Sequence, residues 1–202
     1  MEFLLIEPKT KRGQATLALI LEVAEQIFSD KGYSETSVTD ITKAAGVATG
    51  TFYQYFPGKL ELYKYLIEEC GKQIIEAMKV NDLPEGLSRR EIEKAGIRSW
   101  LQLAHDKPQY YRIIWESLFI DKEIFISWYR KFFSIYEQGI LTGQSEGTVK
   151  NFDSEVLAYT LMGAANFLGI HLAILNTEKK EWDLDYIADE YMKIFEQGVF
   201  LE

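Results

Sequence analysis

The sequence predicts an all-α protein, and three observations support that class. Apolar residues recur at three- and four-residue spacing along most of the 202-residue chain, which is the repeat of a helix with one buried face. Ser37 and Ser88 are each followed three residues later by an acidic residue, which is the capping-box pattern of helix starts. No run alternates between apolar and polar residues as a half-buried strand would.

Three short helices are expected before a long one. In the first, the apolar residues of 17–28 share one face, and Gly32 follows where a helix needs a left-handed stop. The second covers 37–46 and starts with the first capping box. The third covers 48–56 and ends at a Pro-Gly pair, after which a long helix extends over 59–78.

The remaining chain predicts five more helices, which gives about nine in all. Ser88 opens two helices that are divided near Pro108, because proline suits the first turn of a helix. The apolar residues of 124–136 cover more than one helical face, which indicates a largely buried helix. Residues 153–175 and 184–201 supply the last two helices.

Charge supports two expected domains, residues 9–58 and residues 59–202. The whole chain has a net charge of −9. Residues 9–59 hold six basic and five acidic side chains, whereas residues 60–202 hold 16 basic and 24 acidic ones. The acidic excess therefore belongs to the second part. The first part can still present a local basic face to phosphates, since electrostatic forces act over about 10 Å.

Several features predict a cytoplasmic protein. The single cysteine, Cys70, cannot form an internal disulfide and fits a reducing compartment. The chain starts with apolar residues followed by basic ones, which is the reverse of a secretory signal. The longest apolar stretch, residues 157–175, contains Asn166, His171 and glycines, so we expect no membrane span.

The segment SVTDITKAAGVATGTFYQYF has the order of features that a helix-turn-helix needs. A small residue at 44 or 45 faces the partner helix, Gly46 makes the tight turn and Val47 follows as an apolar plug. Phe52 and Phe56 lie four residues apart and face the core. The polar side chains expected to point outward, where they can bond to base edges, are Thr49, Thr51, Tyr53, Gln54 and Tyr55.

On the sequence GVATGTFYQYFPGK, the chain resembles the TetR family of bacterial transcriptional regulators. The resemblance covers about residues 14–63. It implies a homodimeric repressor that binds double-stranded operator DNA and releases it when a small, largely apolar effector binds. By position, it implies that Thr49, Gly50, Thr51 and Gln54 approach bases, that Tyr53, Tyr55 and Lys59 contact phosphates, and that Thr39 lies near the DNA backbone or a base.

The chain departs from the family pattern at two places. Ala48-Thr49 stands where a Lys or Ser-Lys is usual before the Gly-Thr pair, and Pro57-Gly58 replaces a commoner polar pair. We therefore expect more of the DNA contact to come from the N-terminal arm, through Lys9, Lys11 and Arg12.

The second domain is rich in aromatic residues, which fits an apolar effector cavity with a few polar groups and equally fits plain core packing. Asn166 stands alone among apolar neighbours and is the candidate polar anchor, because a buried amide needs a partner. The candidate effector-binding residues are Tyr63, Ile67, Cys70, Ile74, Trp100, Trp115, Trp128, Phe132 and Asn166. The first four share one face of the long helix, which touches both domains and is therefore the expected switch element.

The last two helices carry stripes that suit helix pairing. In the TetR family these helices pair with their copies, so we expect a homodimer through them; packing within one subunit is the alternative. Small residues allow helices to approach closely. The stripes are Ala158, Ala165, Gly169 and Ala173 on the first helix, and Leu184, Ile187, Tyr191, Ile194, Phe195 and Gly198 on the second.

Two other classes compete with a DNA-binding regulator: a helical enzyme and a protein-interaction module without DNA binding. The chain has no Gly-x-Ser-x-Gly, Walker, dinucleotide-glycine or His-Glu-x-x-His pattern. No catalytic residue is therefore assigned and no cofactor is expected. His105 and His171 are the only histidines, which excludes a His-rich metal site. The interaction module is disfavoured because it gives no reason for polar residues on a short helix.

Overall fold

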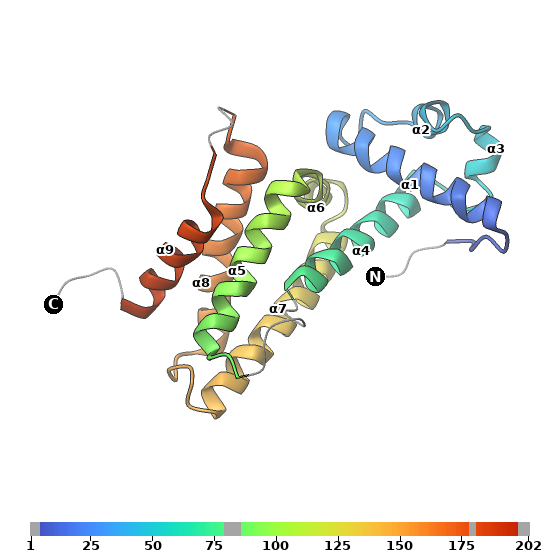
Figure 1. The fold of residues 1–202 in the computed structure, drawn as a ribbon. Coiled ribbons are helices and arrows are strands. Elements are labelled where there is room, and N and C mark those ends of the chain that lie inside the picture. The colour runs from blue at the N-terminus through green and yellow to red at the C-terminus, as the bar shows by residue number, and fades with distance from the viewer. Residues whose placement is uncertain (1–4, 79–85, 178–180, 198–202) are drawn as a thin grey trace. The chain divides into compact units, whose positions relative to one another are not determined.

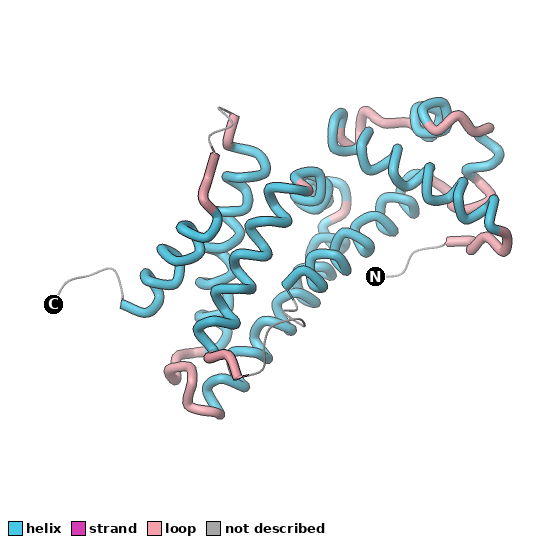
Figure 2. The backbone as a smooth tube through the Cα atoms, in the orientation of Figure 1, coloured by secondary structure: helices cyan, strands magenta, loops and turns pink. Residues whose placement is uncertain are grey.

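The computed structural model describes residues 5–78, 86–177 and 181–197. Within these ranges every regular element is a helix (Figures 1 and 2), which confirms the all-α class. The elements are α1 (Lys11–Lys31), α2 (Val38–Ala44), α3 (Thr49–Phe52), α4 (Lys59–Met78), α5 (Arg89–Asp106), α6 (Pro108–Ile120), α7 (Lys122–Ser145), α8 (Ser154–Ile170), the π-helix η1 (His171–Leu175) and α9 (Leu184–Gln197).

Local sequence signals set the ends of the N-terminal helices. The Thr10 hydroxyl caps α1 by accepting a hydrogen bond from the Gly13 amide at 3.1 Å. The Ser37–Asp40 capping box opens α2 as predicted, with both of its reciprocal bonds present. Gly46 has a φ of 65°, a left-handed conformation that glycine adopts without strain. The turn between α2 and α3 therefore lies where the sequence predicts it.

Helix α3 is shorter than predicted, because it ends at Phe52 and not at Phe56. After Phe52 the chain tightens: the Gln54 amide donates to the Thr51 carbonyl at 3.2 Å and the Tyr55 amide to the Phe52 carbonyl at 2.9 Å. These three-residue bonds replace α-helical ones. The tighter winding brings three aromatic side chains inward, since Phe52, Tyr55 and Phe56 are all buried.

The described residues form two compact units. One unit contains the chain up to Lys72 together with Gln109–Tyr129, and the other contains Gln73–Pro108 and the chain from Arg130 onward. Helices α4 and α7 contribute to both units, and α6 belongs with the N-terminal helices. The division into residues 9–58 and 59–202 stays a prediction about function, because compactness alone groups the helices differently.

In the first unit, α4 packs against α1, α6 and α7. Tyr63 is fully buried, its ring contacts the Phe28 ring edge-on, and its hydroxyl donates to the Ile113 carbonyl at 2.5 Å. Burial raises the pKa of this hydroxyl. A β-carbon at position 71 would overlap the Trp128 ring. Gly71 therefore allows α4 and α7 to approach closely.

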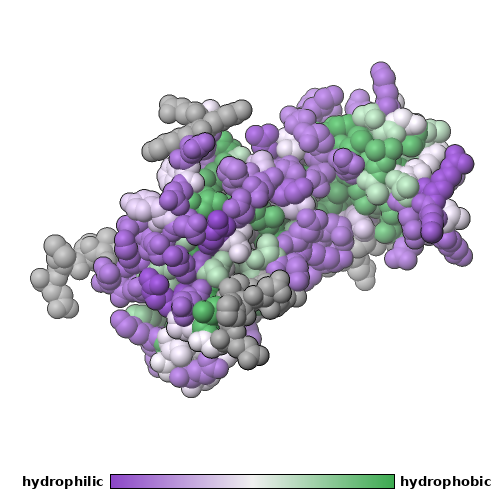
Figure 3. All heavy atoms as spheres, viewed as in Figure 1, coloured by the Kyte–Doolittle hydropathy of each residue, from purple (hydrophilic) through white to green (hydrophobic). Residues whose placement is uncertain are grey.

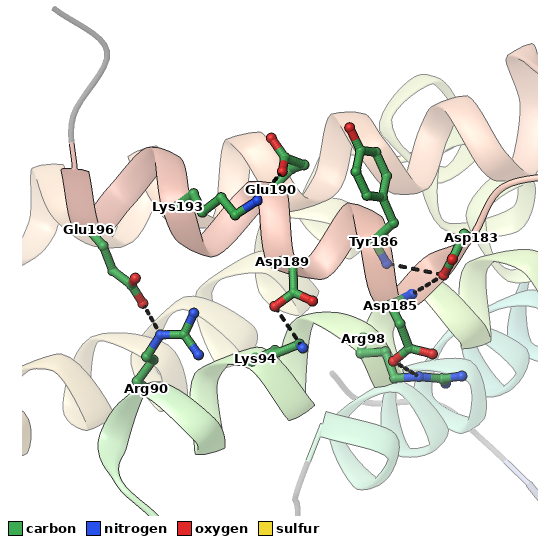
Figure 4. A network of polar contacts seen from close by, with 10 residues as sticks. All are labelled: Arg90, Lys94, Arg98, Asp183, Asp185, Tyr186, Asp189, Glu190, Lys193 and Glu196. Atoms are coloured by element: carbon green, nitrogen blue, oxygen red, sulfur yellow. Dashed lines mark hydrogen bonds and ion pairs between the residues drawn. The ribbon is translucent and has the colours of Figure 1, made fainter. Parts of the chain in front are cut away.

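In the second unit, α5 packs against α8 and α9. The Trp100 indole nitrogen donates to the Ala165 carbonyl at 3.1 Å, which ties α5 to α8. Three ion pairs tie α5 to the antiparallel α9 (Figure 4): Arg90 with Glu196 at 2.5 Å, Lys94 with Asp189 at 2.7 Å and Arg98 with Asp185 at 3.0 Å.

Replacing Lys94 with alanine is expected to lower the melting temperature by less than about 3 °C, because partly exposed ion pairs contribute little to stability. Pairing with Lys94 lowers the pKa of Asp189. The contribution of the pair is therefore present at neutral pH and is lost as the pH falls through that lowered pKa. Thermal unfolding in low salt and in 1 M salt checks this, since salt should remove the difference. The exposed Lys150 offers a control without an ion pair among the described residues.

The small residues of α8 and η1 do not face outward. Ala158, Gly169 and Ala173 are buried within the second unit, and Ala165 accepts the Trp100 bond. On α9, Ile187 and Tyr191 are buried too, whereas Ile194 is 51% exposed; Leu184 and Phe195 are partly buried, and Gly198 lies outside the described residues. The two stripes that the sequence suggested as a dimer surface therefore pack largely within one subunit. This is the alternative that the sequence left open.

A different stripe of α8 and η1 is exposed. It contains large apolar side chains at Val156 (65%), Tyr159 (55%), Phe167 (69%) and Ile174 (39%). By length and composition the 22-residue run Ser154–Leu175 could cross a membrane, and 22% of its most apolar 18-residue window is buried. The face of the molecule seen in Figure 3 is mostly hydrophilic. Exposed apolar residues in one helical stripe indicate a surface that another structure covers.

Candidate DNA-binding site

The second helix of the helix-turn-helix presents polar side chains to solvent as predicted. Ala45 is buried and faces the partner helix. The residues predicted to approach DNA that are exposed are Thr39, Thr49, Gly50, Tyr53 and Gln54, while Thr51 is half-buried; Lys11 and Arg12 are exposed in the first turn of α1. Contact of these residues with DNA stays a prediction.

The expectation that Tyr55 points outward is wrong. Its side chain is only 6% exposed, and its hydroxyl donates to the Gly13 carbonyl at 3.1 Å. Its backbone carbonyl accepts a hydrogen bond from the Ile6 amide at 2.9 Å. Because the ring lies inside the domain, Tyr55 holds the start of α1 instead of presenting a free hydroxyl to a phosphate.

Lys59 is also turned inward. Its ammonium donates to the Tyr33 and Thr36 carbonyls, both at 2.6 Å, and lies 4.0 Å from the centre of the Tyr33 ring. Desolvation lowers the pKa of this ammonium. Lys59 therefore fixes the segment between α1 and α2, and two of the three hydrogen bonds that its ammonium can donate are already used.

A Lys59→Met variant is expected to lower the free energy of unfolding by about 1–2 kcal/mol, because two carbonyls in a partly buried place lose their donor. Lys31→Met, in the exposed last turn of α1, is the matched control and should change stability little. Chemical denaturation measures both. Unchanged stability together with a salt slope for DNA binding that falls by about one would instead support the phosphate contact implied by the family.

Helix α6 joins α1 through polar contacts that connect residues more than 80 positions apart. The Gln109 amide donates to the Glu25 carboxylate at 3.0 Å. Arg112 donates to the Ser29 carbonyl at 3.3 Å. Beyond them, the Tyr33 amide donates to the Glu116 carboxylate at 2.8 Å. These three contacts, which we call the α6 clamp, hold the C-terminal end of α1, and no local sequence signal indicates them.

The candidate effector residues divide between the two units. In the first unit, Tyr63, Ile67, Cys70 and Trp128 are buried and Trp115 is half-buried. In the second unit, Ile74 and Trp100 are buried, Phe132 and Asn166 are half-buried, and the Trp100 and Phe132 rings stack at 6.0 Å. The burial of the α4 residues fits the predicted stripe, while their role in binding an effector stays a prediction.

The second unit contains a polar network that sequence reasoning missed. Arg89 pairs with Glu93 and donates to the Gly139 carbonyl at 3.1 Å. The Tyr136 hydroxyl donates to the other Glu93 oxygen at 3.3 Å, and burial raises its pKa well above the usual value. The Tyr191 hydroxyl bonds to α8 at the Leu161 carbonyl at 3.0 Å. The only local signal was the four-residue spacing of Arg89 and Glu93.

Among the described residues, no group of three or more His, Cys, Asp or Glu side chains is placed to hold a metal ion. The two histidines are far apart in the sequence and have different partners. His105 pairs with the neighbouring Asp106 at 2.9 Å, and His171 contacts the Trp182 ring. Both therefore have structural contacts of their own.

Comparisons with known proteins agree with the helix-turn-helix. The family model described as bacterial regulatory proteins of the tetR family matches residues 20–66. Over 72 residues the chain is 36% identical to the fatty acid metabolism regulator protein of Bacillus subtilis, covering 36% of this chain and 37% of that protein. Over 110 residues it is 26% identical to the transcriptional activator FasR of Mycolicibacterium smegmatis, covering 54% of this chain and 48% of that protein.

The chain thus spans less than half the length of these curated relatives. Over most of its length the fold is also found in solved structures. The transcriptional regulator FadR of Bacillus subtilis, solved in complex with stearoyl-CoA, superposes with a TM-score of 0.73 at 20% identity, covering 91% of this chain and all of that one. The matched N-terminal motif and the shared fold together lead to one conclusion: residues 20–66 match the DNA-binding part of bacterial regulatory proteins of the tetR family, and the chain has the fold of such regulators.

Proposed function

We propose that the protein is a cytoplasmic transcriptional repressor that binds a near-palindromic operator as a homodimer and releases it when an effector binds. The observation that carries the proposal is the exposed polar surface of α3 above the buried Phe52 and Phe56. A short helix whose inner side is anchored in the core and whose outer side is polar is suited to the major groove.

The exposed stripe of α8 supports the dimer. Val156, Tyr159 and Phe167 leave apolar surface in water, and Gly163 lies between them with nothing within 4 Å of the place of a β-carbon. A second helix can therefore approach closely at the centre of the stripe, as helix pairs do at small residues. A two-fold pair would bury this surface and place two recognition helices on one operator.

We infer that the effector is a long-chain fatty acyl thioester of coenzyme A. A fatty acid metabolism regulator is among the relatives, and one structural neighbour was solved with stearoyl-CoA. The second unit suits the apolar part of such a ligand, since the Trp100 and Phe132 rings stack there and Asn166 adds a half-buried polar amide. These residues remain proposed binding residues, and so, in the first unit, do Tyr63, Ile67 and Cys70.

The α6 clamp supports a route from the effector to the DNA-binding helices. α6 and α4 both pack with the N-terminal helices in one unit, and Tyr63 ties α4 to α6 at the Ile113 carbonyl. An effector that shifts either helix therefore moves the end of α1. Such a shift would change the separation of the recognition helices in the dimer.

The test begins with genomic fragments selected by binding to the protein, followed by a retardation assay on one such fragment. Stearoyl-CoA should release the fragment, whereas coenzyme A alone and stearate alone should not. A reporter gene behind that fragment should be expressed less when the protein is present. Absence of fragment binding would reject the regulator, release by none of the three compounds would reject the effector class alone, and increased expression would identify an activator.

A further inference from the structure

The N-terminal arm, residues 5–10, lies against the end of the recognition segment, by which we mean residues 49–55. The Ile6 amide donates to the Tyr55 carbonyl at 2.9 Å. From the same residue, the Tyr55 hydroxyl donates to the Gly13 carbonyl at 3.1 Å. Tyr55 therefore holds both the arm and the helix that follows it: its backbone binds the beginning of the arm, and its side chain binds the first turn of α1.

Gly13 makes this arrangement possible by leaving space for the arm. A β-carbon at position 13 would lie 2.8 Å from the Pro8 β-carbon and 3.2 Å from the Thr10 hydroxyl oxygen. The first distance is shorter than two carbon atoms tolerate. Gly13 is helical and has no positive φ, so its backbone conformation does not require glycine. Only the lack of space for a side chain does. The arm therefore packs directly on the first turn of α1.

The arm, through Lys9, and the first turn of α1, through Lys11 and Arg12, carry the positive charge of this end of the domain. Lys9, Lys11 and Arg12 are all exposed, and Glu7 is the only acidic residue in positions 5–12. Tyr53 and Gln54, the exposed end of the recognition segment, directly precede the residue that holds the arm. Basic side chains next to the helix that reads bases are placed to bind the phosphates that flank those bases.

We propose that Tyr55 is a positioning residue: it fastens both the arm and the first turn of α1, so that Lys9, Lys11 and Arg12 form a fixed second contact surface for duplex DNA. The proposal rests on the proposed DNA binding. An arm that is already ordered loses less conformational freedom on binding than a free one. Tyr55 also keeps the three charges of the arm and the first turn of α1 at a constant distance from the recognition helix, so that both surfaces engage one duplex together.

The experiment measures the salt dependence of binding to a fluorescent 30-base-pair duplex of random sequence, because phosphate contacts do not depend on sequence. A variant with Lys9→Gln, Lys11→Gln and Arg12→Gln should lower the salt slope by about two to three. Tyr55→Phe keeps the ring and the backbone bond to Ile6 but removes the hydroxyl that holds the first turn of α1, and should lower the slope by about one to two. Combined, the four changes should have no further effect beyond the three charge changes.

Tyr33→Phe is the matched control, because it removes a half-buried hydroxyl of the same unit away from the arm. Gly13→Ala displaces the arm by a different route and should reproduce the effect of Tyr55→Phe. Amide exchange at Ile6 should be slow in the wild type and faster in both variants, because each loosens the packing around the Ile6–Tyr55 backbone bond, and this readout does not need DNA.

Additive losses from Tyr55→Phe and the charge changes would overturn the proposal, because Tyr55 would then act on stability alone. An unchanged slope in Tyr55→Phe would overturn it as well. A wild-type chain that binds no duplex would reject DNA binding itself and this proposal with it, whereas the other two results leave DNA binding standing.

Discussion

A Phe167→Asp variant is expected to be monomeric and to bind an operator fragment about 100-fold more weakly than the wild-type chain. Phe167 is 69% exposed at the middle of the apolar stripe of α8. In a symmetric dimer each substitution occurs twice, and each would bury an unpaired carboxylate, which is costly. A monomer loses the second half-site, which acts at high effective concentration in the dimer. Light scattering at micromolar concentration and fluorescence anisotropy check both effects.

Phe119→Asp provides the matched control. Phe119 on α6 is 85% exposed, so the same substitution puts the same charge at an even more open position outside the α8 stripe. This variant should remain dimeric and keep its affinity for DNA. A dimeric Phe167→Asp variant would show that the stripe is not the interface, while loss of the dimer in both variants would indicate a general effect of added charge.

The sequence predicted the features that depend on neighbouring residues. The Ser37–Asp40 box requires contact over three residues only, and it forms as expected. Phe52 and Phe56 face the core because a helical turn brings them together. The exposure of Gln54 follows from the same geometry. Local periodicity was sufficient for these elements because no distant residue competes for their side chains.

Tyr55 and Lys59 could not be predicted in this way. Their spacing leaves them free to point outward, but the acceptors that bind them inside are 42 residues away for Tyr55 and 23 and 26 residues away for Lys59. Tertiary contacts therefore decided their orientation. The same holds for α8, where both a small stripe and a large apolar stripe exist, and periodicity does not say which of them faces the chain's own α5 and α9.

The α6 clamp leads to a prediction about the switch. Replacing Arg112 and Glu116 with alanine should leave stearoyl-CoA binding intact and operator binding within a few-fold of wild type, while stearoyl-CoA no longer releases the operator. Both residues hold the end of α1 from α6, at the Ser29 carbonyl and the Tyr33 amide. Without them the clamp keeps only the Gln109–Glu25 bond, and a shift of α6 has no direct polar hold on the C-terminal end of α1. The coupling free energy, typically about 1–3 kcal/mol, should fall toward zero.

Linkage makes the measurement specific, because the operator must weaken stearoyl-CoA binding by the same factor by which stearoyl-CoA weakens operator binding. Titrating stearoyl-CoA with and without operator should therefore give two affinities in the wild type and a single one in the variant. Lys122→Ala with Glu123→Ala, at exposed positions of α7, removes the same charges outside the clamp. In this control the stearoyl-CoA affinities with and without operator should still differ. If the clamp variant still releases the operator fully, the clamp is structural and α4 alone carries the signal. If even the wild type shows one affinity, stearoyl-CoA is not the effector and the clamp must be tested with another compound that releases the operator.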